Sequence, residues 1–542
     1  MADYDYIIIG AGSAGCVLAH RLVAAGQRVL LLEAGPSDRS PWIQVPIGYG
    51  KTFVDPRYNW RYETLPDPGL DGRRGYCPRG KVLGGSGSIN AMVWVRGHPG
   101  DFDDWQAAGN PGWGWQQVLP YFRKCEDYCG GASTYHGAGG PLYIGEVSKA
   151  VHPLCASFVD ACATLGIPRT ADFNGASPEG AGIWQVTIKN GVRVSTANSY
   201  LRAARGSALL ELKTRAHATR LLFDGRRACG VEYRAGGRTE RADARGEILL
   251  AAGAINSPQL LQLSGIGDRT LLGRLGIPLR HELPAVGQGL QDHLAASYFF
   301  RARVPTLNNE LFPLLGRLRA ALRYLYARQG PLAMSVNQAG AFVRTDAALA
   351  RPNLQVYFNP LSYTTTTGLR RKMTRPDPWP GFLLAFNSCR PRSRGSVAIV
   401  SVDPLAPPAI SSGYLSADAD IADVYAGTQL LRRIAAAEPF AALIESEIVP
   451  GPAVQSEAAL LADFRARAGS VFHCCGSCAM GPDPRRSVVD ARLRVHGLER
   501  LRVVDASIFP TVTSGNTQAP VVMVAEKAAD LILEDALSPS GC

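Results

Sequence analysis

The pattern of hydrophobic positions is clearest near the N-terminus, where two short apolar runs flank an amphipathic stretch. Tyr6–Ile9 runs into the glycine-rich segment Gly10–Gly15, and Val29–Leu32 ends at Glu33. Short apolar runs of this kind, bounded by turn residues, are typical of buried strands, and the roughly dozen residues between them have helical spacing. The sequence therefore predicts a strand, a helix and a second strand in succession.

Three glycines and one acid in this unit have distinct physical tasks. Gly10 permits a tight turn, Gly12 lets the backbone approach a pyrophosphate, and Gly15 allows the helix to pack closely on the strand. The helix N-terminus offers free N–H groups to phosphate oxygens. Glu33 lies about twenty residues further on, where a carboxylate accepts hydrogen bonds from a ribose 2′-OH. These features predict a dinucleotide site for FAD or NAD rather than NADP.

The pattern changes several times beyond this unit. Residues 36–79 are rich in Pro, Gly, Trp and Tyr without periodicity, which indicates long loops. Residues 104–129 carry three tryptophans that we expect in a core. Residues 209–252 alternate apolar and polar positions around two glycine turns, which predicts a small antiparallel sheet ending in the strand Glu247–Ala251. Residues 253–267 are expected to turn from that strand into a helix.

The second half of the chain mixes both kinds of element. Within residues 300–465 we expect strands at Asn353–Asn359, Gly381–Asn387 and Ser396–Ser401, and helices at Ala417–Ala436 and Glu457–Ala468. The C-terminal part again has the pattern of the N-terminal unit, a short apolar strand followed by a helix. The strand is expected at Leu501–Val504, and the amphipathic helix from Ala519 to about Ala536. This alternation predicts a nucleotide-binding domain assembled from distant segments, with a second domain inserted.

Composition narrows the class of protein. The chain has 542 residues, of which 46% are hydrophobic and 19% charged, so it is expected to form two or more folded domains. Its net charge is +11, but the basic residues are scattered, and a run such as Leu369–Lys372 is short. We expect solvated surface charge and no nucleic-acid partner, while peripheral contact with an anionic membrane surface stays open.

Targeting signals and metal-binding motifs are not evident. The first apolar strand begins close to Met1, and no apolar run of about 18 residues follows, so we expect a cytoplasmic protein without an integral membrane segment. The 12 cysteines are dispersed. We interpret them as mostly buried, reduced thiols, and we expect no metal site, even at the cluster Cys474, Cys475 and Cys478.

Longer motifs carry a resemblance to a known family. Together with the N-terminal fingerprint, the chain resembles the glucose-methanol-choline (GMC) family of flavin oxidoreductases. It looks most like the alcohol dehydrogenase branch that includes L-sorbose and polyethylene glycol dehydrogenases, and we expect a bacterial protein. The resemblance rests on Gly80–Gly97, Gly253–Gly267, Val286–His293, Ser470–Gly481, Val504–Pro510 and Ser514–Pro520. It spans the chain from residue 5 to the last helix, and it favours FAD over NAD at the fingerprint.

The resemblance implies a fold and a division into domains. The expected fold is mixed α/β, a Rossmann-like FAD-binding domain with an inserted substrate-binding domain built on an antiparallel sheet with flanking helices. The first domain would comprise residues 1–155 with 190–300 and 466–542. The inserted domain would comprise residues 156–189 with 301–465.

The resemblance also implies which residues hold FAD. The ADP half is expected at the N-terminal unit, the isoalloxazine at the second glycine-rich segment, and the ribityl and pyrimidine parts near the C-terminus. The expected contacts are Gly10, Gly12, Ser13, Gly15, Glu33, Val82, Gly87, Asn90, Ala91, Ala218, Asp505, Ala506 and Gln518. We expect noncovalent FAD, although His98 lies near the point where some relatives attach the flavin.

Oxidation of an alcohol by a flavin needs a group that accepts the hydroxyl proton. His473 stands at the family's catalytic histidine, and Asn516 at the second catalytic position, which is His or Asn. The resemblance therefore implies that His473 is the base and Asn516 orients the hydroxyl. His98, His293 and His496 are expected to be structural or loop residues. The family commonly has Pro after the catalytic histidine, whereas this chain has Cys474.

The substrate is less well specified. Gln338, Val471 and Phe472 are expected in the substrate pocket, and Gln338 stands where choline-oxidising relatives carry a Glu. A neutral amide lacks the charge that stabilises a quaternary ammonium, so choline is disfavoured. A primary alcohol, polyol, sugar alcohol, ketose or polyether is favoured. Oxidation by O2 of aryl, alkyl or choline-like alcohols and a non-redox hydroxynitrile lyase remain alternatives, and the acceptor is expected to be O2 or a quinone or cytochrome.

Overall fold

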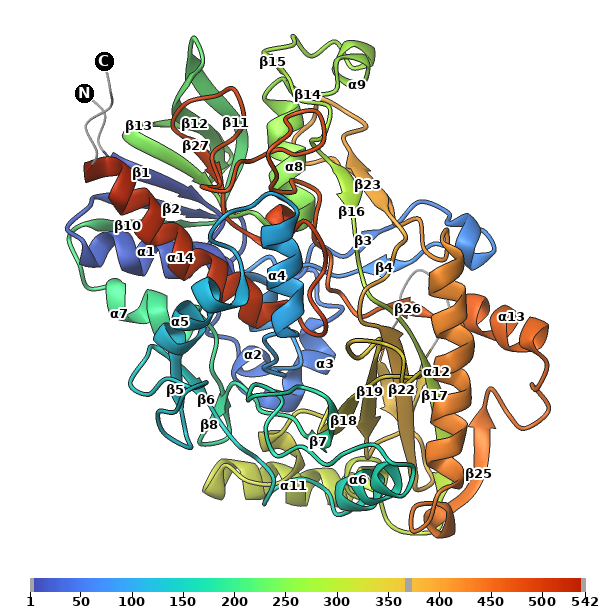
Figure 1. The fold of residues 1–542 in the computed structure, drawn as a ribbon. Helices are drawn as coiled ribbons and strands as arrows, with labels where there is room; N and C mark the ends of the chain where they lie inside the picture. Colours follow the sequence, from blue (N-terminus) through green and yellow to red (C-terminus); the bar gives the residue numbers. More distant parts are fainter. Residues whose placement is uncertain (1–3, 366–372, 538–542) are drawn as a thin grey trace.

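Two seven-stranded sheets dominate the computed structural model, which describes residues 4–365 and 373–537 (Figure 1). The basic run 369–372 lies outside the described residues. The first sheet has the order β10-β2-β1-β13-β12-β11, with β27 beside β13. Its strands are β1 Tyr4–Ile9, β2 Val29–Glu33, β10 Leu210–Thr214, β11 Ala216–Asp224, β12 Arg227–Ala235, β13 Arg238–Leu250 and β27 Leu501–Val503.

The long strand β13 belongs to two parts of this sheet. Its end runs parallel to β1 and β27, while its beginning pairs antiparallel with β12. The predicted strands β1 and β2 are confirmed, and their nearly complete burial explains the unbroken apolar runs. One expectation is wrong: Leu210–Thr214 is not part of the antiparallel hairpins but a parallel edge strand beside β2.

The two ends of the chain meet beside the parallel sheet. Helix α1 (Ser13–Ala24) connects β1 to β2, and α14 (Gln518–Leu537) packs against it (Figure 1). Arg21 on α1 forms ion pairs with Glu526 and Asp530 on α14. The hydroxyl of Tyr200 donates to Glu526 Oε1 at 2.7 Å. These largely buried contacts hold the middle of α14 against α1.

The second sheet is antiparallel and has the order β25-β17-β22-β19-β18-β7, with β26 added to β17. The predicted strands around 353–359 and 381–387 are confirmed as β19 and β22. The two predicted helices are confirmed as α12 (Asp418–Ala436), which packs on β22, and α13 (Glu457–Arg467). The strands are β7 Gly180–Ile183, β17 Leu294–Ala302, β18 Ala339–Val343, β19 Leu354–Asn359, β22 Gly381–Ser388, β25 Ile444–Val449 and β26 Gly469–Ser470.

Smaller elements connect the sheets. The strand expected at 396–401 is shorter, β23 (Gly395–Ala398), and it lies in a separate three-stranded sheet. The other helices are α2 Pro41–Gln44, α3 Tyr49–Thr52, α4 Pro99–Ala107, α5 Trp115–Cys125, α6 Leu154–Thr164, α7 Arg202–Ala204, α8 Gly253–Leu263, α9 Arg269–Arg274, α10 Leu307–Leu311 and α11 Leu314–Ala327. The other strands are β3 Tyr62–Glu63, β4 Tyr76–Cys77, β5 Glu126–Tyr128, β6 Leu142–Ile144, β8 Ile188–Lys189, β9 Val192–Arg193, β14 Ile266–Gly267, β15 His281–Glu282, β16 Gln288–Leu290, β20 Tyr363–Thr365, β21 Met373–Pro376 and β24 Ala409–Ser411.

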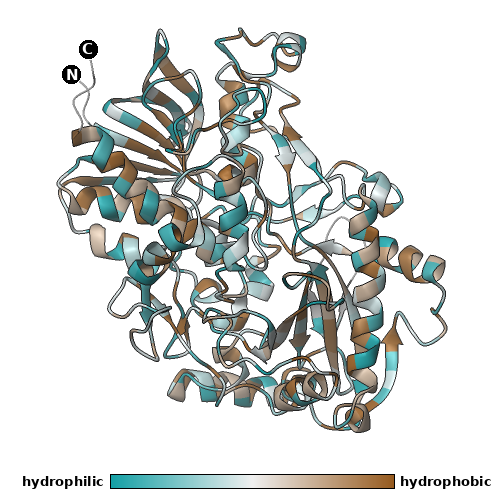
Figure 2. Cartoon of the chain, in the orientation of Figure 1, coloured by the Kyte–Doolittle hydropathy of each residue, from teal (hydrophilic) through white to brown (hydrophobic). Residues whose placement is uncertain are grey.

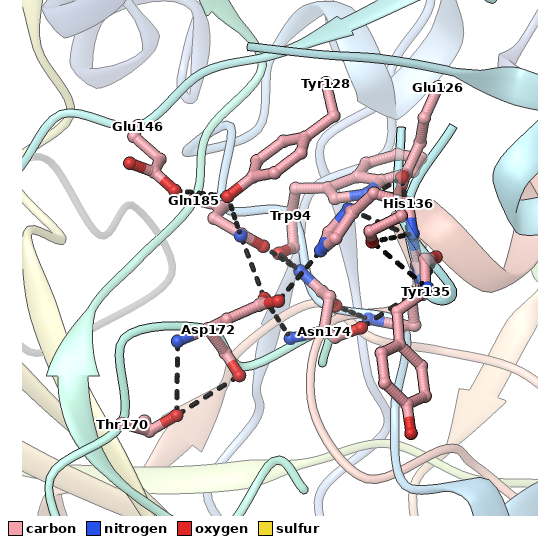
Figure 3. A network of polar contacts seen from close by, with 12 residues as sticks. Trp94, Glu126, Tyr128, Tyr135, His136, Glu146, Thr170, Asp172, Asn174 and Gln185 are labelled. Atoms are coloured by element: carbon pink, nitrogen blue, oxygen red, sulfur yellow. Dashed lines mark hydrogen bonds and ion pairs between the residues drawn. The ribbon is translucent and has the colours of Figure 1, made fainter. Parts of the chain in front are cut away.

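A buried polar network joins the chain after the second glycine-rich segment to the start of the antiparallel sheet (Figure 3). Arg96 forms an ion pair with Glu126, which also accepts from the indole of Trp94 at 2.8 Å. His136 bridges Glu126 and Asp172 at 3.0 and 2.9 Å. Burial raises the pKa of Glu126, but Arg96 and His136 outweigh it and leave the pKa below its usual value. The network therefore holds charged groups in the interior.

The cysteines of the described residues are free and mostly buried, as predicted. Among the same residues, no group of three or more His, Cys, Asp or Glu side chains is placed to hold a metal ion. None of the helices in the described part of the chain combines the length and the apolar character that crossing a membrane requires.

Candidate active site

A cavity of about 410 Å³ is lined by residues from both sheets. Gly10 and Glu33, at the carboxyl ends of β1 and β2, line what we call its parallel-sheet side. Ser297, Tyr357 and Leu383, on β17, β19 and β22, line its antiparallel-sheet side. The carboxyl ends of parallel strands are the usual place for a nucleotide in this kind of sheet.

The first glycine-rich loop is shaped for close backbone contacts. Gly10 has a φ of +101°, and a Cβ on Gly15 would lie only 1.9 Å from the carbonyl oxygen of Gly10. A Cβ on Gly12, in contrast, would meet no protein atom closer than 3.9 Å. Packing within the protein therefore does not require glycine at position 12, and the space is left to the cavity. Helix α1 begins there without a side-chain cap, so its first N–H groups are available to an anion.

Glu33 is buried and tied to the backbone on both oxygens. Its Oε2 accepts from the N–H of Ala11 at 3.0 Å, and its Oε1 accepts from the N–H of Gly35 at 2.8 Å. Burial raises the pKa of Glu33 to about 7, against the opposing effect of these two hydrogen bonds. Each carboxylate oxygen can accept a further hydrogen bond, which suits a ribose hydroxyl.

The second glycine-rich loop packs directly on the first. A Cβ on Gly85 would lie 2.7 Å from Gly12 Cα, and one on Gly87 would lie 2.9 Å from Ser13 Oγ. The hydroxyl of Ser13 donates to Gln518 Oε1 at 2.9 Å, which joins the start of α14 to both loops. Arg193 is buried behind them and donates to Asn90 Oδ1 at 2.8 Å.

His473 lies three residues beyond the end of β26, in a tight loop. Phe472 before it has a φ of +71°, a backbone conformation that is uncommon for a residue with a side chain. Asp292 holds this loop, because its Oδ1 accepts from the N–H of His473 at 2.7 Å. Its Oδ2 accepts from the hydroxyls of Ser470 and, at 2.8 Å, Tyr414. The carboxylate thereby fixes where the imidazole leaves the backbone.

A second histidine fixes the tautomer of the first. His293 Nε2 lies 3.0 Å from the carbonyl oxygen of Cys389, which only accepts, so Nε2 of His293 carries a proton. Its Nδ1 is therefore bare when the ring is neutral and accepts at 2.9 Å from Nδ1–H of His473. This leaves the lone pair of His473 on Nε2, the atom that faces Asn516.

Asn516 is oriented by residues of the antiparallel sheet. Its Oδ1 accepts from Gln355 Nε2 at 3.3 Å, and Gln355 Oε1 accepts from the hydroxyl of Tyr357 at 2.7 Å. The Nδ2 of Asn516 consequently points to His473 Nε2, at 3.1 Å. Both side chains belong to residues that line the cavity.

The surroundings keep His473 neutral. Burial lowers its pKa well below the ordinary value, and the nearby His293 and Arg79 lower it further. A neutral imidazole with its lone pair on Nε2 can accept a proton and cannot donate one from that atom. The arrangement therefore suits a base that works near neutral pH, with an amide donor beside it.

Most of the predicted site residues line the cavity. They are Gly10, Gly12, Ser13, Glu33, Asn90, Ala91, Ala218, Val471, Phe472, His473, Asp505, Ala506, Asn516 and Gln518. Asp505 is more than a lining residue, because it accepts from the N–H of Gly253 and the hydroxyl of Ser257 and so ties α8 to the C-terminal segment.

Four predicted residues do not line it. Gly15 and Gly87 lie behind the loops, where a larger side chain would collide with neighbours. Val82 is buried in a small core with Ile43 and Ile89 rather than facing the cavity. Gln338 turns its amide away, and its Oε1 accepts from the N–H of His152 at 2.8 Å. The expectation that Gln338 faces the substrate is therefore corrected, and with it the argument that position 338 disfavours choline.

Sequence reasoning assigned no role to Asp292 or Arg79, and it expected His293 to be a structural or loop residue. The run ending at His293 is visible as a family motif, but its contact with His473 spans 180 positions of sequence. Arg79 lines the cavity and donates to the carbonyl oxygen of Phe472 at 2.6 Å. Cys474, in place of the family's Pro, places its thiol 3.8 Å from that of Cys77.

The antiparallel-sheet side of the cavity carries polar groups but, among the described residues, no negative charge. It includes the amides of Asn337 and Asn359 and the ring of Tyr363. Among the described residues, the carboxylates in the lining are Glu33 and Asp505, both held by backbone and side-chain donors near the parallel sheet. Arg79 is the guanidinium in the lining.

Comparisons with known proteins agree with this architecture. Two sequence profiles described as GMC oxidoreductase match residues 4–295 and 391–525. The chain is 42% identical to the alcohol dehydrogenase [acceptor] of Pseudomonas putida over 98% of this chain and 96% of that protein. It is 41% identical to the oxygen-dependent choline dehydrogenase of Photobacterium profundum, covering 99% and 94% of the two chains. The chain also superimposes on a structure of formate oxidase from Aspergillus oryzae, which concerns the effect of a mutation on FAD modification, with a TM-score of 0.90. The two chains are 26% identical, and the match covers 99% of each.

Proposed function

Because the chain belongs to the GMC oxidoreductase family, and is therefore an FAD-dependent oxidoreductase acting on alcohols, we propose that it oxidises an uncharged alcohol to an aldehyde or ketone. A primary alcohol, polyol, sugar alcohol, ketose or polyether fits this description. In the proposal His473 is the base and Asn516 orients the hydroxyl. The observation that carries it is the bare Nε2 of His473 facing the amide of Asn516 at the cavity wall.

The residues present fit the cofactor. The room left at Gly12, the uncapped start of α1 and the free acceptor capacity of Glu33 suit a pyrophosphate and a ribose. Asn90, Ala91 and Gln518 would contact the ring system, and Ala218 the adenine. When bound, FAD supplies a hydride acceptor at N5 of the isoalloxazine. We assign no covalent attachment.

Residues of the chain itself would accept the proton of the substrate hydroxyl. A hydroxyl entering between the two side chains would present its proton to His473 Nε2 and accept from Asn516 Nδ2. As the carbinol carbon loses its hydride, the hydroxyl proton moves to Nε2. The resulting imidazolium keeps its Nδ1–H bonded to His293, so the ring stays in place while Nε2 takes up the proton. His293 acts through His473 and is therefore a positioning residue.

The lining supports an uncharged substrate. A quaternary ammonium needs a carboxylate or aromatic cage to offset its desolvation. In the part of the lining that the structure describes, no carboxylate lies on the antiparallel-sheet side, and the Arg79 guanidinium would repel a cation. Aromatic rings, among them Tyr357 and Tyr363, are present, so the proposal rests on the charges of the lining and not on a lack of aromatic residues. Position 338 no longer enters this argument.

Anaerobic mixing of the purified flavoprotein with a panel of alcohols tests the proposal. We expect bleaching of the flavin by at least one uncharged alcohol, and reoxidation by air or a quinone analogue identifies the acceptor. In His473→Ala, the rate of flavin reduction should fall about 10²–10⁴-fold with FAD content unchanged. Absence of bleaching by every alcohol would favour the lyase alternative, and wild-type rates in His473→Ala would refute the assigned base.

The pH profile gives a second test of the base. Since the pKa of His473 is lowered, the neutral form should persist below the ordinary histidine value of about 6.5. We expect the rate of flavin reduction to stay constant from alkaline pH down through neutrality and to fall only in the acidic range. A rate that falls with a midpoint near or above that ordinary value would contradict a buried base.

A further inference from the structure

Helix α11 exposes an unusual amount of apolar surface. Six of the fifteen strongly exposed large hydrophobic residues in the described part of the chain lie on this helix, with exposed fractions between 52% and 88%. In Figure 2 the helix lies at the lower edge of the molecule and alternates hydrophobic with hydrophilic residues. We call this set the α11 patch: Leu314, Leu315, Leu318, Leu322, Leu325 and Tyr326.

The patch forms one face of the helix. Leu314, Leu318, Leu322 and Leu325 follow spacings of four, four and three residues, which place them in line along an α-helix. The opposite side, at Ala320, is buried against the protein. The stripe therefore points directly outward, although burial of an amphipathic helix normally turns its apolar face inward.

Arginines border the stripe. Arg317, Arg319 and Arg323 are exposed on the same helix, which contains no Asp or Glu. The ion pairs found in the described part of the chain involve none of these three. By the turn of the helix, Arg319 follows one edge of the stripe and Arg317 precedes the other. The helix thus combines an apolar face with unpaired cationic flanks.

We propose that α11 seats the protein on an anionic lipid bilayer, with the patch in the acyl boundary and the arginines at the headgroup phosphates. A basic amphipathic helix with Leu and an aromatic residue on its apolar face is the pattern of helices that lie in a membrane interface. A second copy of this chain is a poorer occupant, because a two-fold contact would bring the unpaired arginines of both copies together.

Helix α11 lies close to the wall of the cavity, so contact with a bilayer would also bring the cavity near the lipid. Ala320 packs in a core cluster with Tyr49, Met92 and Val336, and these three residues also line the cavity. The helix therefore shares a hydrophobic cluster with part of the cavity wall. Seating α11 on a bilayer would bring that wall of the cavity next to the lipid surface.

Vesicle sedimentation of the full-length holoenzyme tests the proposal. Vesicles of equal parts phosphatidylcholine and phosphatidylglycerol should pellet the protein, and phosphatidylcholine alone should pellet less. Leu318→Glu/Leu322→Glu should lower the partition coefficient about tenfold or more, since two leucines lose their burial. The matched control Val400→Glu/Val402→Glu changes two residues of similar exposure elsewhere and should bind like wild type.

Charge is tested separately. Arg319→Glu/Arg323→Glu should weaken binding to the anionic vesicles, whereas Arg485→Glu/Arg486→Glu, at another exposed site, should have a much smaller effect. Flavin reduction by alcohol should be unchanged in all four variants, so failure here is separable from failure of the proposed function. Equal binding by patch and control variants would overturn the proposal, as would a wild-type dimer in light scattering that the leucine variant dissociates.

Discussion

The pairing of His293 with His473 is a residue-scale feature with a measurable effect on the proposed base. Without an acceptor at its Nδ1, His473 can place its proton on either nitrogen, and only one of the two neutral tautomers has a bare Nε2. We therefore predict that His293→Leu slows flavin reduction about 10–100-fold, an effect of the size seen when an orienting neighbour is removed. The loss should appear in kcat rather than KM, measured by anaerobic stopped flow.

The pH profile separates this role from a merely structural one. His293 lowers the pKa of His473, so its removal should move the acidic limb of the profile to higher pH. His293→Asn keeps an acceptor near the position of Nδ1 and should recover part of the rate. A His293→Leu variant with an unshifted profile and wild-type kcat would remove His293 from the mechanism.

Residue-scale prediction from the sequence succeeded where the residue lies inside a long motif. His473, Asn516 and Glu33 could be placed because their neighbours along the chain identify them. Gln338 could not, because the direction of its side chain depends on the backbone of His152 rather than on its own segment. Asp292 acts on His473 across 181 positions, and such a contact leaves no local pattern.

At the scale of the element, the glycine-rich loop offers a contrast between two glycines. Gly12→Ala adds a methyl group that meets no protein atom closer than 3.9 Å, so the apoprotein should fold normally but bind FAD poorly. Gly15→Ala puts a Cβ 1.9 Å from the carbonyl oxygen of Gly10, and it should lower the free energy of unfolding by about 1–3 kcal/mol.

Flavin content and thermal unfolding of the apoprotein distinguish the two glycines. Gly273→Ala is a suitable control, because nothing lies within 4 Å of its added Cβ and the residue is inside α9. Equal flavin loss and equal destabilisation in Gly12→Ala and Gly15→Ala would contradict separate roles for the two positions.

The buried network of Figure 3 predicts a pH dependence at the element scale. Burial lowers the pKa of His136, but Asp172 and Glu126 outweigh it and raise the pKa above the ordinary value. The stabilisation from this charged ring is therefore complete below the unfolded value of about 6.5 and is lost as the pH rises through the folded pKa. Glu126 has a lowered pKa, so its contribution is lost only when the pH falls into the acidic range.

His136→Gln should therefore cost more free energy of unfolding in mild acid than in base. We expect about 1–3 kcal/mol near pH 6 and a smaller difference near pH 9, measured by urea denaturation. Wild-type protein at the same two pH values is the reference. A penalty that grows with pH would show that the histidine is neutral in the fold.

Elements with strong local patterns were predicted closely, and those defined by pairing partners were not. β1 and β2 are buried on both faces, so their sequences are continuously apolar. Leu210–Thr214 has the same alternation as the hairpins that follow it, and only its parallel pairing with β2 shows that it belongs elsewhere. β13 serves two kinds of pairing at once, which no periodicity reveals.

At the scale of the whole molecule, the order of motifs predicted the fold class, because each motif fixes a segment of a known arrangement. The division into a discontinuous FAD-binding domain and an inserted substrate-binding domain stays a proposal. Residues from both sheets line the cavity, so neither sheet forms it alone. The charge of the cavity depends on which side chains of distant segments, such as Arg79, line it. The amino-acid composition does not predict which side chains these are.

The charge of the cavity gives the last prediction. Choline and its tert-butyl analogue have nearly the same size and shape, and they differ in that choline carries a positive charge. Because the described lining contains the guanidinium of Arg79 and has no carboxylate on its antiparallel-sheet side, the neutral analogue should be oxidised with the higher kcat/KM. A desolvated charge facing a guanidinium is unfavourable by more than about 1.4 kcal/mol, so we expect at least about a tenfold preference. The preference should appear mainly in KM, since the hydroxyl end of both alcohols meets the same His473 and Asn516. Steady-state rates with both alcohols under one acceptor provide the measurement. Faster oxidation of choline than of the neutral analogue would show that the proposed preference for uncharged alcohols is wrong.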